Sequence, residues 1–382
     1  MIDYHLASFE FLGIVYYEVM LSMIMGAFSV LTDKRKYAYI ILSLLPLMLM
    51  TMFRAETVGN DTLEYLMHFE SISDLSLIQV LEYGRFENGY LVFTYFLRTL
   101  SHENQILLIV SGLLMYTSLA MWISKWCSAP GLFVCLLVEM LYVDSWMSII
   151  RQSLALFIIL FSFNYLVKRN FKGYILTVLL ASQFHNAAFS FLLVWPIVYW
   201  INNSNTYKYS HEISEKRTLL IFSFVCLVLY ILLGELLNYF ISIFPIYSYY
   251  VSSDYMDGNT RIAVYLKLVI FILMIVVPIL FKKKKLLDKD VVFRHALNVL
   301  TYINLVFWIL ANQATLLVRF TDIFSFFALA NFVENINDMS IKHNRTILII
   351  MSVAAFFIYG LTITILKTPE WQTTYPFKWC FM

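Results

Sequence analysis

Charged residues are scarce in this sequence. They make up 14% of its 382 residues, whereas 61% are hydrophobic. A soluble globular domain carries about 25% charged and roughly 45–50% apolar residues. Both departures exclude an ordinary soluble domain and favour a polytopic membrane protein. The formal net charge of +2 does not indicate a nucleic-acid partner, and we expect none.

Sequence motifs for common cofactors and metals are also lacking. The four cysteines form no C-x-x-C pair, so we expect neither a disulfide framework nor a metal site. No P-loop, G-x-G-x-x-G or H-E-x-x-H occurs, which leaves ATP-driven transport and zinc hydrolysis unsupported. We therefore predict an activity without metal or cofactor. Asp288 and Asp290 form a D-x-D beside four lysines, and we interpret this segment as a charged topogenic loop.

Processing signals and linkers are missing as well. The first ten residues, "MIDYHLASFE", contain no basic stretch and no small-residue cleavage motif. The first apolar run is therefore interpreted as a retained membrane helix. No internal repeat and no linker rich in Pro, Gly or Ser interrupts the chain. These absences predict a single membrane domain over residues 1–382.

Long apolar runs are what the sequence has in abundance. A bilayer-spanning helix needs about 20 mostly apolar residues. This criterion predicts an all-α protein with twelve spans, at 10–31, 37–53, 104–124, 130–147, 150–167, 171–185, 187–201, 218–243, 262–281, 295–312, 319–335 and 346–366. The segment 88–100 is too short and contains Arg98, so we expect an interfacial or re-entrant helix.

The lysines and arginines between these runs predict the orientation. With the N-terminus outside, the inner loops hold 18 Lys and Arg residues and the outer segments hold 8. This bias favours an N-out, C-out topology. It places the loop 54–103, with predicted surface helices, on the outer side. The loop 244–261 and the tail 367–382 fall on the same side.

The outer cations are mostly arginine. Arg accounts for 6 of the 8, whereas Lys accounts for 13 of the 18 inner ones. The planar guanidinium binds phosphate through two parallel hydrogen bonds, so the outer face is predicted to hold an anion. The alternative is that these arginines pair with outer carboxylates, namely Glu56, Asp61, Glu64 and Glu87. Arg151 and Arg319 lie at outer span ends, where an ionisable side chain needs a partner.

Several motifs, taken together, resemble one known family. They are "RAETVGNDTLEYLMHF" at 54–69, "ENGY" at 87–90, "RQSLA" at 151–155, "FHN" at 184–186, "RF" at 319–320 and "TYPFK" at 374–378. In order, spacing and outer placement they resemble the motifs of the EpsG-like branch of the bacterial Wzy-type polysaccharide polymerases. Asn60 and the order of residues in the tail depart from the pattern of that family.

The resemblance implies a reaction. Such enzymes transfer a growing glycan from undecaprenyl diphosphate to the non-reducing end of the next lipid-linked repeat unit. They act at the outer face of the bacterial cytoplasmic membrane and use no nucleotide sugar. The lipid-linked oligosaccharide and membrane lipid are then the expected partners. A flippase and a chain-length regulator of the same pathway are expected partners as well.

The resemblance also suggests roles for single residues. Diphosphate binding is assigned to Arg54, Arg151 and Arg319. Orienting or deprotonating the acceptor hydroxyl is assigned to Asp61, Glu87 and His185, with His185 preferred because it lies at a span end in apolar surroundings. Glycan contacts are assigned to Gln152, Tyr249 and Tyr250. A lone histidine is more commonly a hydrogen-bonded structural residue, and outer tyrosines more commonly anchor a chain at the interface.

Two other classes of protein fit parts of the pattern. A lipid-linked glycan ligase needs the same arginines for the same leaving group. A secondary transporter of an anionic substrate suits twelve spans, but no two matching halves are visible. On the polymerase interpretation the polar stretch at 51–69 forms the outer edge of a lipid-diphosphate site. There Gly59 supplies a turn, and Tyr65 and Phe69 pack beneath a surface helix.

Overall fold

A computed structural model describes residues 13–14, 16–21, 33–82, 85–203, 211–243, 262–280, 291–367, 374 and 377–381. Within these ranges the chain forms helices and no strand, which confirms the all-α prediction, and Arg54 and Trp379 form an isolated antiparallel bridge. The chain divides into two compact units. The first combines Met1–Phe189 with Ile341–Met382, and the second is Ser190–Ser340.

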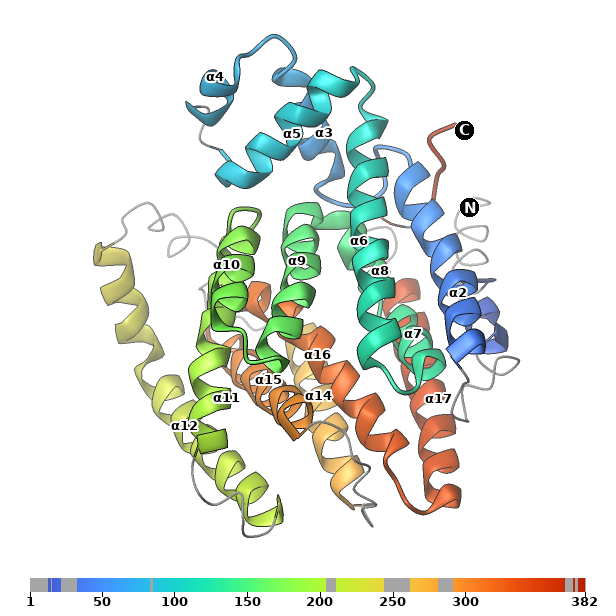
Figure 1. Ribbon diagram of the computed structural model, residues 1–382, viewed down its shortest axis with the longest axis vertical. Helices are drawn as coiled ribbons and strands as arrows, with labels where there is room; N and C mark the ends of the chain where they lie inside the picture. Colours follow the sequence, from blue (N-terminus) through green and yellow to red (C-terminus); the bar gives the residue numbers. More distant parts are fainter. Residues whose placement is uncertain are drawn as a thin grey trace. The chain divides into compact units, whose positions relative to one another are not determined.

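The first unit is built around long apolar helices. It includes α2 (Asp33–Phe53), α6 (Gln105–Trp126), α7 (Pro130–Glu139), α8 (Tyr142–Ser148), α9 (Ile150–Val167), α10 (Phe171–Ser182) and α17 (Lys342–Lys367). A helix pairs its backbone N–H and C=O groups internally, which is necessary in lipid because lipid chains offer no hydrogen-bond partners. In Figure 1, α6 lies between α2 and α9, α10 packs on α9, and α17 packs on α7.

The predicted span 130–147 is broken in the structure. It consists of α7 and α8, which meet at a bend of 61°. At the break Leu141 adopts a φ of 61°, a left-handed conformation that is costly for a residue with a Cβ. Irregular backbone at membrane depth occurs where protein buries it or where it lines a cavity. Here the break is buried, because Leu141 is only 1% exposed.

Three short helices follow α2, as the sequence predicts for the loop 54–103. They are α3 (Thr62–Ser71), α4 (Leu77–Glu82) and α5 (Asn88–Leu100), and they lie together beyond one end of α9 and α10 (Figure 1). Buried Ile72, Val80 and Leu91 form their common core.

A tight turn connects α2 to these surface helices. Gly59 has a φ of +96°, and a Cβ there would lie 2.8 Å from the carbonyl oxygen of Met147. The predicted turn at Gly59 is therefore confirmed. Tyr65 and Phe69 of α3 are 3% and 0% exposed, so both pack inward as predicted.

The second unit is a bundle of its own. It includes α11 (Val194–Asn203), α12 (His211–Ile243), α14 (Ile262–Leu280), α15 (Val291–Leu310) and α16 (Val318–Asn337). A 3₁₀ helix, η1 (Asn186–Leu193), leads into it. Its centre is α15 against α16. Between these helices the Ser325 hydroxyl donates to the Asn304 side chain at 2.8 Å, and hydrogen bonds of this kind hold helices together in lipid.

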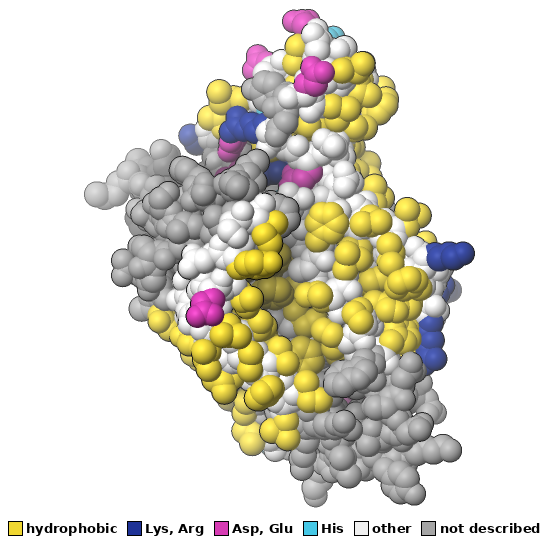
Figure 2. Space-filling model, turned by 90° about the vertical axis from the view of Figure 1, so that its left-hand side faces the viewer, with side chains coloured by type: hydrophobic (Ala, Val, Ile, Leu, Met, Phe, Trp, Pro, Cys, Tyr) yellow, Lys and Arg dark blue, Asp and Glu magenta, His cyan; other side chains and the backbone are white. Residues whose placement is uncertain are grey.

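Seven described helices are long and apolar enough to cross a membrane, or eight if α7 and α8 count as one bent span. The helix over Phe171–Ser182 is among the shorter apolar ones. Most of the predicted first span, 10–31, and the loop 244–261 lie outside the described residues. Hydrophobic side chains cover much of the described surface in Figure 2, as contact with lipid requires. The count of twelve spans and the N-out, C-out orientation stay predictions.

Candidate active site

A polar pocket of about 360 Å³ opens in the first unit where three motif segments meet. It is lined by Arg85, Phe86, Glu87, Asn88, Arg151, Ser182, Gln183 and Asn186. These residues come from the start of α5, the first turn of α9 and the turn after α10. Seven of the eight are polar, which is unusual in so apolar a chain and marks the pocket as a candidate site.

Glu87 holds the two ends of this pocket together. Its Oε2 accepts a charge-assisted hydrogen bond from Nη1 of Arg151, and its Oε1 accepts from the backbone N–H of Asn186 at 3.1 Å. The side chains of Arg151 and Glu87 are only 20% and 13% exposed. Bonds of this kind are among the stronger ones in proteins, so Glu87 fixes the position of Arg151.

A second ion pair joins Arg85 to Glu64 of α3, and these side chains are 50% and 48% exposed. The alternative expectation, that these arginines pair with nearby carboxylates, is thus confirmed for Arg85 and Arg151. The pairing of Arg85 does not exclude anion binding, because an exposed pair contributes little stability and exchanges readily.

Aromatic rings surround the Arg151 guanidinium. Its Cζ lies 4.4 Å from the centre of the Phe86 ring, 5.7 Å from that of Tyr65 and 6.0 Å from that of Tyr90. A cation over an aromatic face is stabilised by the ring quadrupole. Phe86 and Tyr90 also contact each other edge to face, with ring centres 5.5 Å apart. The rings therefore hold Arg151 in a defined orientation toward the pocket.

Burial sets the protonation of the neighbouring groups. Burial and, to a smaller extent, the charge of Arg151 together lower the pKa of His68 to about 4, so His68 is neutral at pH 7. Burial raises the pKa of Tyr65 and of Tyr90, so both phenols stay protonated. Arg151 and Glu87 are thus the charged groups at the centre of this aromatic cluster.

The E-x-G-Y motif has a structural explanation. A Cβ on Gly89 would lie 2.5 Å from the Cβ of Gln183 and 2.8 Å from its carbonyl oxygen. The next residue, Tyr90, donates its backbone N–H to the same carbonyl at 3.0 Å. Only glycine allows this close approach of α5 to the end of α10, and the approach brings Glu87 to Arg151 and Asn186.

His185 follows α10 on the same turn as Asn186. Its Nδ1 accepts a hydrogen bond from the backbone N–H of Ala187 at 3.2 Å. The neutral ring therefore carries its proton on Nε2 and presents a donor there. Among the described residues His185 is not part of the pocket lining, and neither is Asp61, which is the N-cap residue of α3.

Arg54 is buried, being 1% exposed, and it contacts backbone carbonyls. Its Nε donates to Val58 at 3.3 Å, its Nη2 donates to Met147 at 3.0 Å, and its Nη1 donates to Thr51. Its own backbone is bridged to Trp379, beside the hydrogen bond from Ala55 N to the Lys378 carbonyl at 2.8 Å. Arg54 therefore ties the end of α2, the end of α8 and the C-terminal tail together.

Replacing Arg54 by alanine is expected to destabilise the first unit by roughly 3 kcal/mol, because three buried carbonyls lose a charged donor. A melting curve of purified protein in detergent, followed by tryptophan fluorescence, measures this. The control is Arg85→Ala, which removes a half-exposed guanidinium and should leave the melting temperature unchanged. Loss of activity in Arg54→Ala without any thermal shift would instead return Arg54 to the substrate site.

The other predicted residues lie elsewhere. Gln152 is buried at 4% exposure in α9 and does not line the pocket. Arg319 is in the first turn of α16, in the second unit, with an exposed side chain. Tyr249 and Tyr250 lie outside the described residues. Their proposed contacts stay predictions. Arg85, Phe86 and Gln183 were not predicted as site residues, although Phe86 precedes the E-x-G-Y motif directly.

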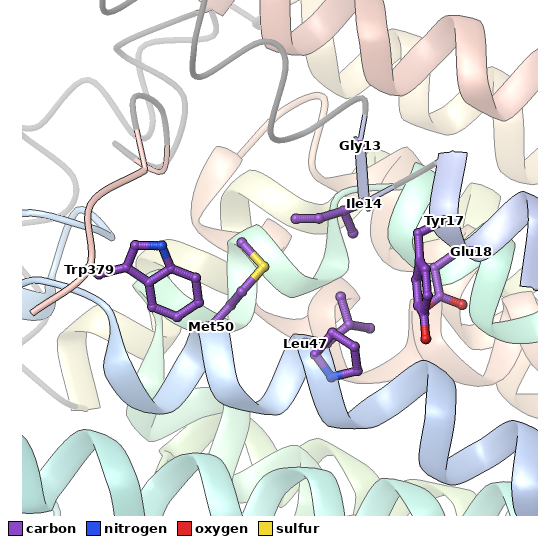
Figure 3. A pocket seen from close by; sticks show the side chains of 8 residues that line it. Gly13, Ile14, Tyr17, Glu18, Leu47, Met50 and Trp379 are labelled. Atoms are coloured by element: carbon purple, nitrogen blue, oxygen red, sulfur yellow. The ribbon is translucent and has the colours of Figure 1, made fainter.

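A second pocket, of about 340 Å³, is mainly apolar (Figure 3). Trp379 lies at one end of it, and Tyr17 and Glu18 lie at the other. The lining residues are Gly13, Ile14, Tyr17, Glu18, Pro46, Leu47, Met50 and Trp379. None of these is a cation, so this pocket is unsuited to a diphosphate.

Comparison with known families identifies the chain. A family model described as the EpsG family matches residues 37–379, a range that includes every motif from Arg54 to the tail. No curated protein and no solved structure matches the chain. The resemblance predicted from the motifs is thereby confirmed. The chain belongs to the EpsG family, whose members are membrane proteins of polysaccharide biosynthesis.

Proposed function

We propose that this protein is a polysaccharide polymerase. It transfers a growing glycan from undecaprenyl diphosphate to the non-reducing end of the next lipid-linked repeat unit. The reaction takes place at the outer face of the bacterial cytoplasmic membrane. The observation that supports this most is the Arg151–Glu87 ion pair, which lines a polar pocket at the start of an 18-residue apolar helix. A lipid-borne diphosphate needs a cation at this type of position.

Arg151 is the proposed ligand of the donor diphosphate. It lies in the first turn of α9, where the unpaired N–H groups and the dipole of the helix already favour an anion. Charge develops on the diphosphate as its bond to the sugar breaks, and a guanidinium aimed at it lowers the barrier. Arg319 is proposed for the second diphosphate. Arg54 is not proposed as a diphosphate ligand, because its guanidinium donates to backbone carbonyls.

Glu87 is the proposed general base. It lines the pocket, whereas Asp61 and His185 do not, so it replaces His185 as the preferred candidate. The acceptor hydroxyl oxygen attacks the anomeric carbon, and the bond from that carbon to the diphosphate oxygen breaks. The electron pair leaves with the lipid diphosphate, and the hydroxyl proton passes to Glu87. Direct displacement of this kind inverts the anomeric carbon. His185 is proposed to donate a hydrogen bond to the glycan.

Other contacts proposed for the substrate rest on the family resemblance. Gln152, Tyr249 and Tyr250 are proposed glycan contacts, and a flippase and a chain-length regulator are proposed partners. The lipid carrier accounts for the membrane location of the enzyme, since its chain stays in the bilayer during transfer.

The first experiment uses purified protein in lipid nanodiscs with its lipid-diphosphate-linked repeat unit and no nucleotide sugar. Products resolved on a gel are expected to form a ladder of multiples of the repeat unit. Transfer of glycan only to an added non-lipid acceptor would identify a ligase instead. Folded protein that makes no product but moves the substrate across a sealed vesicle would identify a transporter.

A further inference from the structure

We propose that Arg85 and Arg151 bind one diphosphate between them, across the polar pocket. This inference rests on the proposed function. It adds a second cation, Arg85, to the site proposed for the donor diphosphate at Arg151. Both arginines line the pocket, and both lie over the same ring. The Cζ of Arg85 is 5.5 Å from the centre of the Phe86 ring, and that of Arg151 is 4.4 Å from it.

The segment that supplies Arg85 also supplies the rest of this arrangement. Arg85, Phe86 and Glu87 are consecutive and precede α5 directly. Arg151 comes from α9, and the backbone N–H of Asn186 comes from the turn after α10. One side of the pocket is therefore rigid, because three aromatic rings surround Arg151. The other side carries Arg85 on a half-exposed side chain.

Each arginine has a carboxylate partner that an anion can replace. Arg85 pairs with Glu64 and Arg151 pairs with Glu87. A lipid–sugar diphosphate carries two negative charges, one on each phosphate, which match two guanidinium groups. Binding of the diphosphate replaces the two arginine–carboxylate pairs by two arginine–phosphate pairs, so the number of charge pairs is conserved. The exposed Arg85–Glu64 pair opens with little loss of stability.

The exchange has a consequence for the order of events. In the structure, the Oε2 of Glu87 is held by Arg151. Once the diphosphate occupies Arg151, that oxygen is released toward the acceptor hydroxyl. The donor therefore has to bind before Glu87 can take a proton from the acceptor hydroxyl.

Pyrophosphate binding to the purified protein tests the proposal. Inorganic pyrophosphate is titrated calorimetrically, with inorganic phosphate as the single-phosphate comparison. Arg85→Ala is expected to weaken pyrophosphate binding at least tenfold. Lys342→Ala removes one exposed cation at the start of α17, in the same unit and outside every motif named above, and should change binding less than twofold. Phosphate has a single phosphoryl group, so it is expected to bind more weakly and to respond less to Arg85→Ala.

A variant that binds pyrophosphate more tightly provides a second test, because misfolding would weaken binding rather than tighten it. Glu64→Gln removes the carboxylate that competes for Arg85 and is expected to tighten pyrophosphate binding several-fold. Glu70→Gln makes the same change on the same helix, at an exposed position away from Arg85, and should have no effect.

The outcomes separate this inference from the polymerase proposal. Equal pyrophosphate binding in Arg85→Ala and Lys342→Ala, with an intact ladder in the nanodisc assay, overturns the two-arginine site but not the polymerase proposal. Binding that depends on Arg85, without any ladder from the unaltered protein, supports the site and rejects the polymerase.

Discussion

Replacing Arg151 by alanine is expected to reduce polymer formation by about a hundredfold or more, the usual effect of removing a group that stabilises developing charge. The change removes the cation that lies over Phe86 and pairs with Glu87. The nanodisc assay measures the effect as the rate at which the ladder appears. Lys342→Ala, which removes an exposed cation outside the pocket, should keep the full rate.

Arg151→Lys separates charge from geometry. Lysine keeps the positive charge but loses the planar fork that binds two phosphate oxygens together, so we expect about a tenfold loss of rate. Near-normal rate and polymer length in this variant would exclude a bidentate contact at Arg151 and reduce its role to a point charge.

Replacing Gly89 by alanine is expected to lower polymerisation by roughly a hundredfold, although Gly89 itself does not line the pocket. The new Cβ would lie 2.5 Å from the Gln183 Cβ and 2.8 Å from its carbonyl oxygen. The start of α5 has to move away from α10, and Glu87 moves with it. A shift of about 1 Å between a base and its substrate is enough for a loss of this size.

Gly234→Ala is the matched control for this substitution. Gly234 lies within α12, and a Cβ there meets nothing within 4 Å, so the variant should retain full activity. Wild-type rates from Gly89→Ala would show that the contact between α5 and Gln183 does not position the site.

The sequence predicts helices best where composition alone decides them. The predicted span 150–167 coincides with α9, and the predicted span 37–53 ends at the same residue as α2. The break at Leu141 could not be predicted, because no Gly or Pro marks it. The tertiary packing around residues 140–141 imposes a conformation that leucine rarely adopts by itself.

The site was predictable as a set of residues but not as a set of contacts. Glu87 and Arg151 are 64 positions apart in sequence, and Arg54 reaches the Met147 carbonyl across 93 positions. A sequence pattern identifies both arginines as unusual outer cations. It does not tell which one faces a pocket and which one supports backbone carbonyls, because that depends on how distant segments pack.

The division of the first unit has a consequence for biosynthesis. Residues 341–382 belong to it, although all of Ser190–Ser340 is translated before them. Until α17 emerges from the ribosome, α7 lacks the helix that packs on it. In the same interval the Arg54 segment lacks the strand-like pairing with Trp379. The second unit, whose segment is continuous, can assemble during translation. The unit that contains the polar pocket is therefore completed only after α17 has been inserted, although every residue that lines the pocket is translated before the second unit.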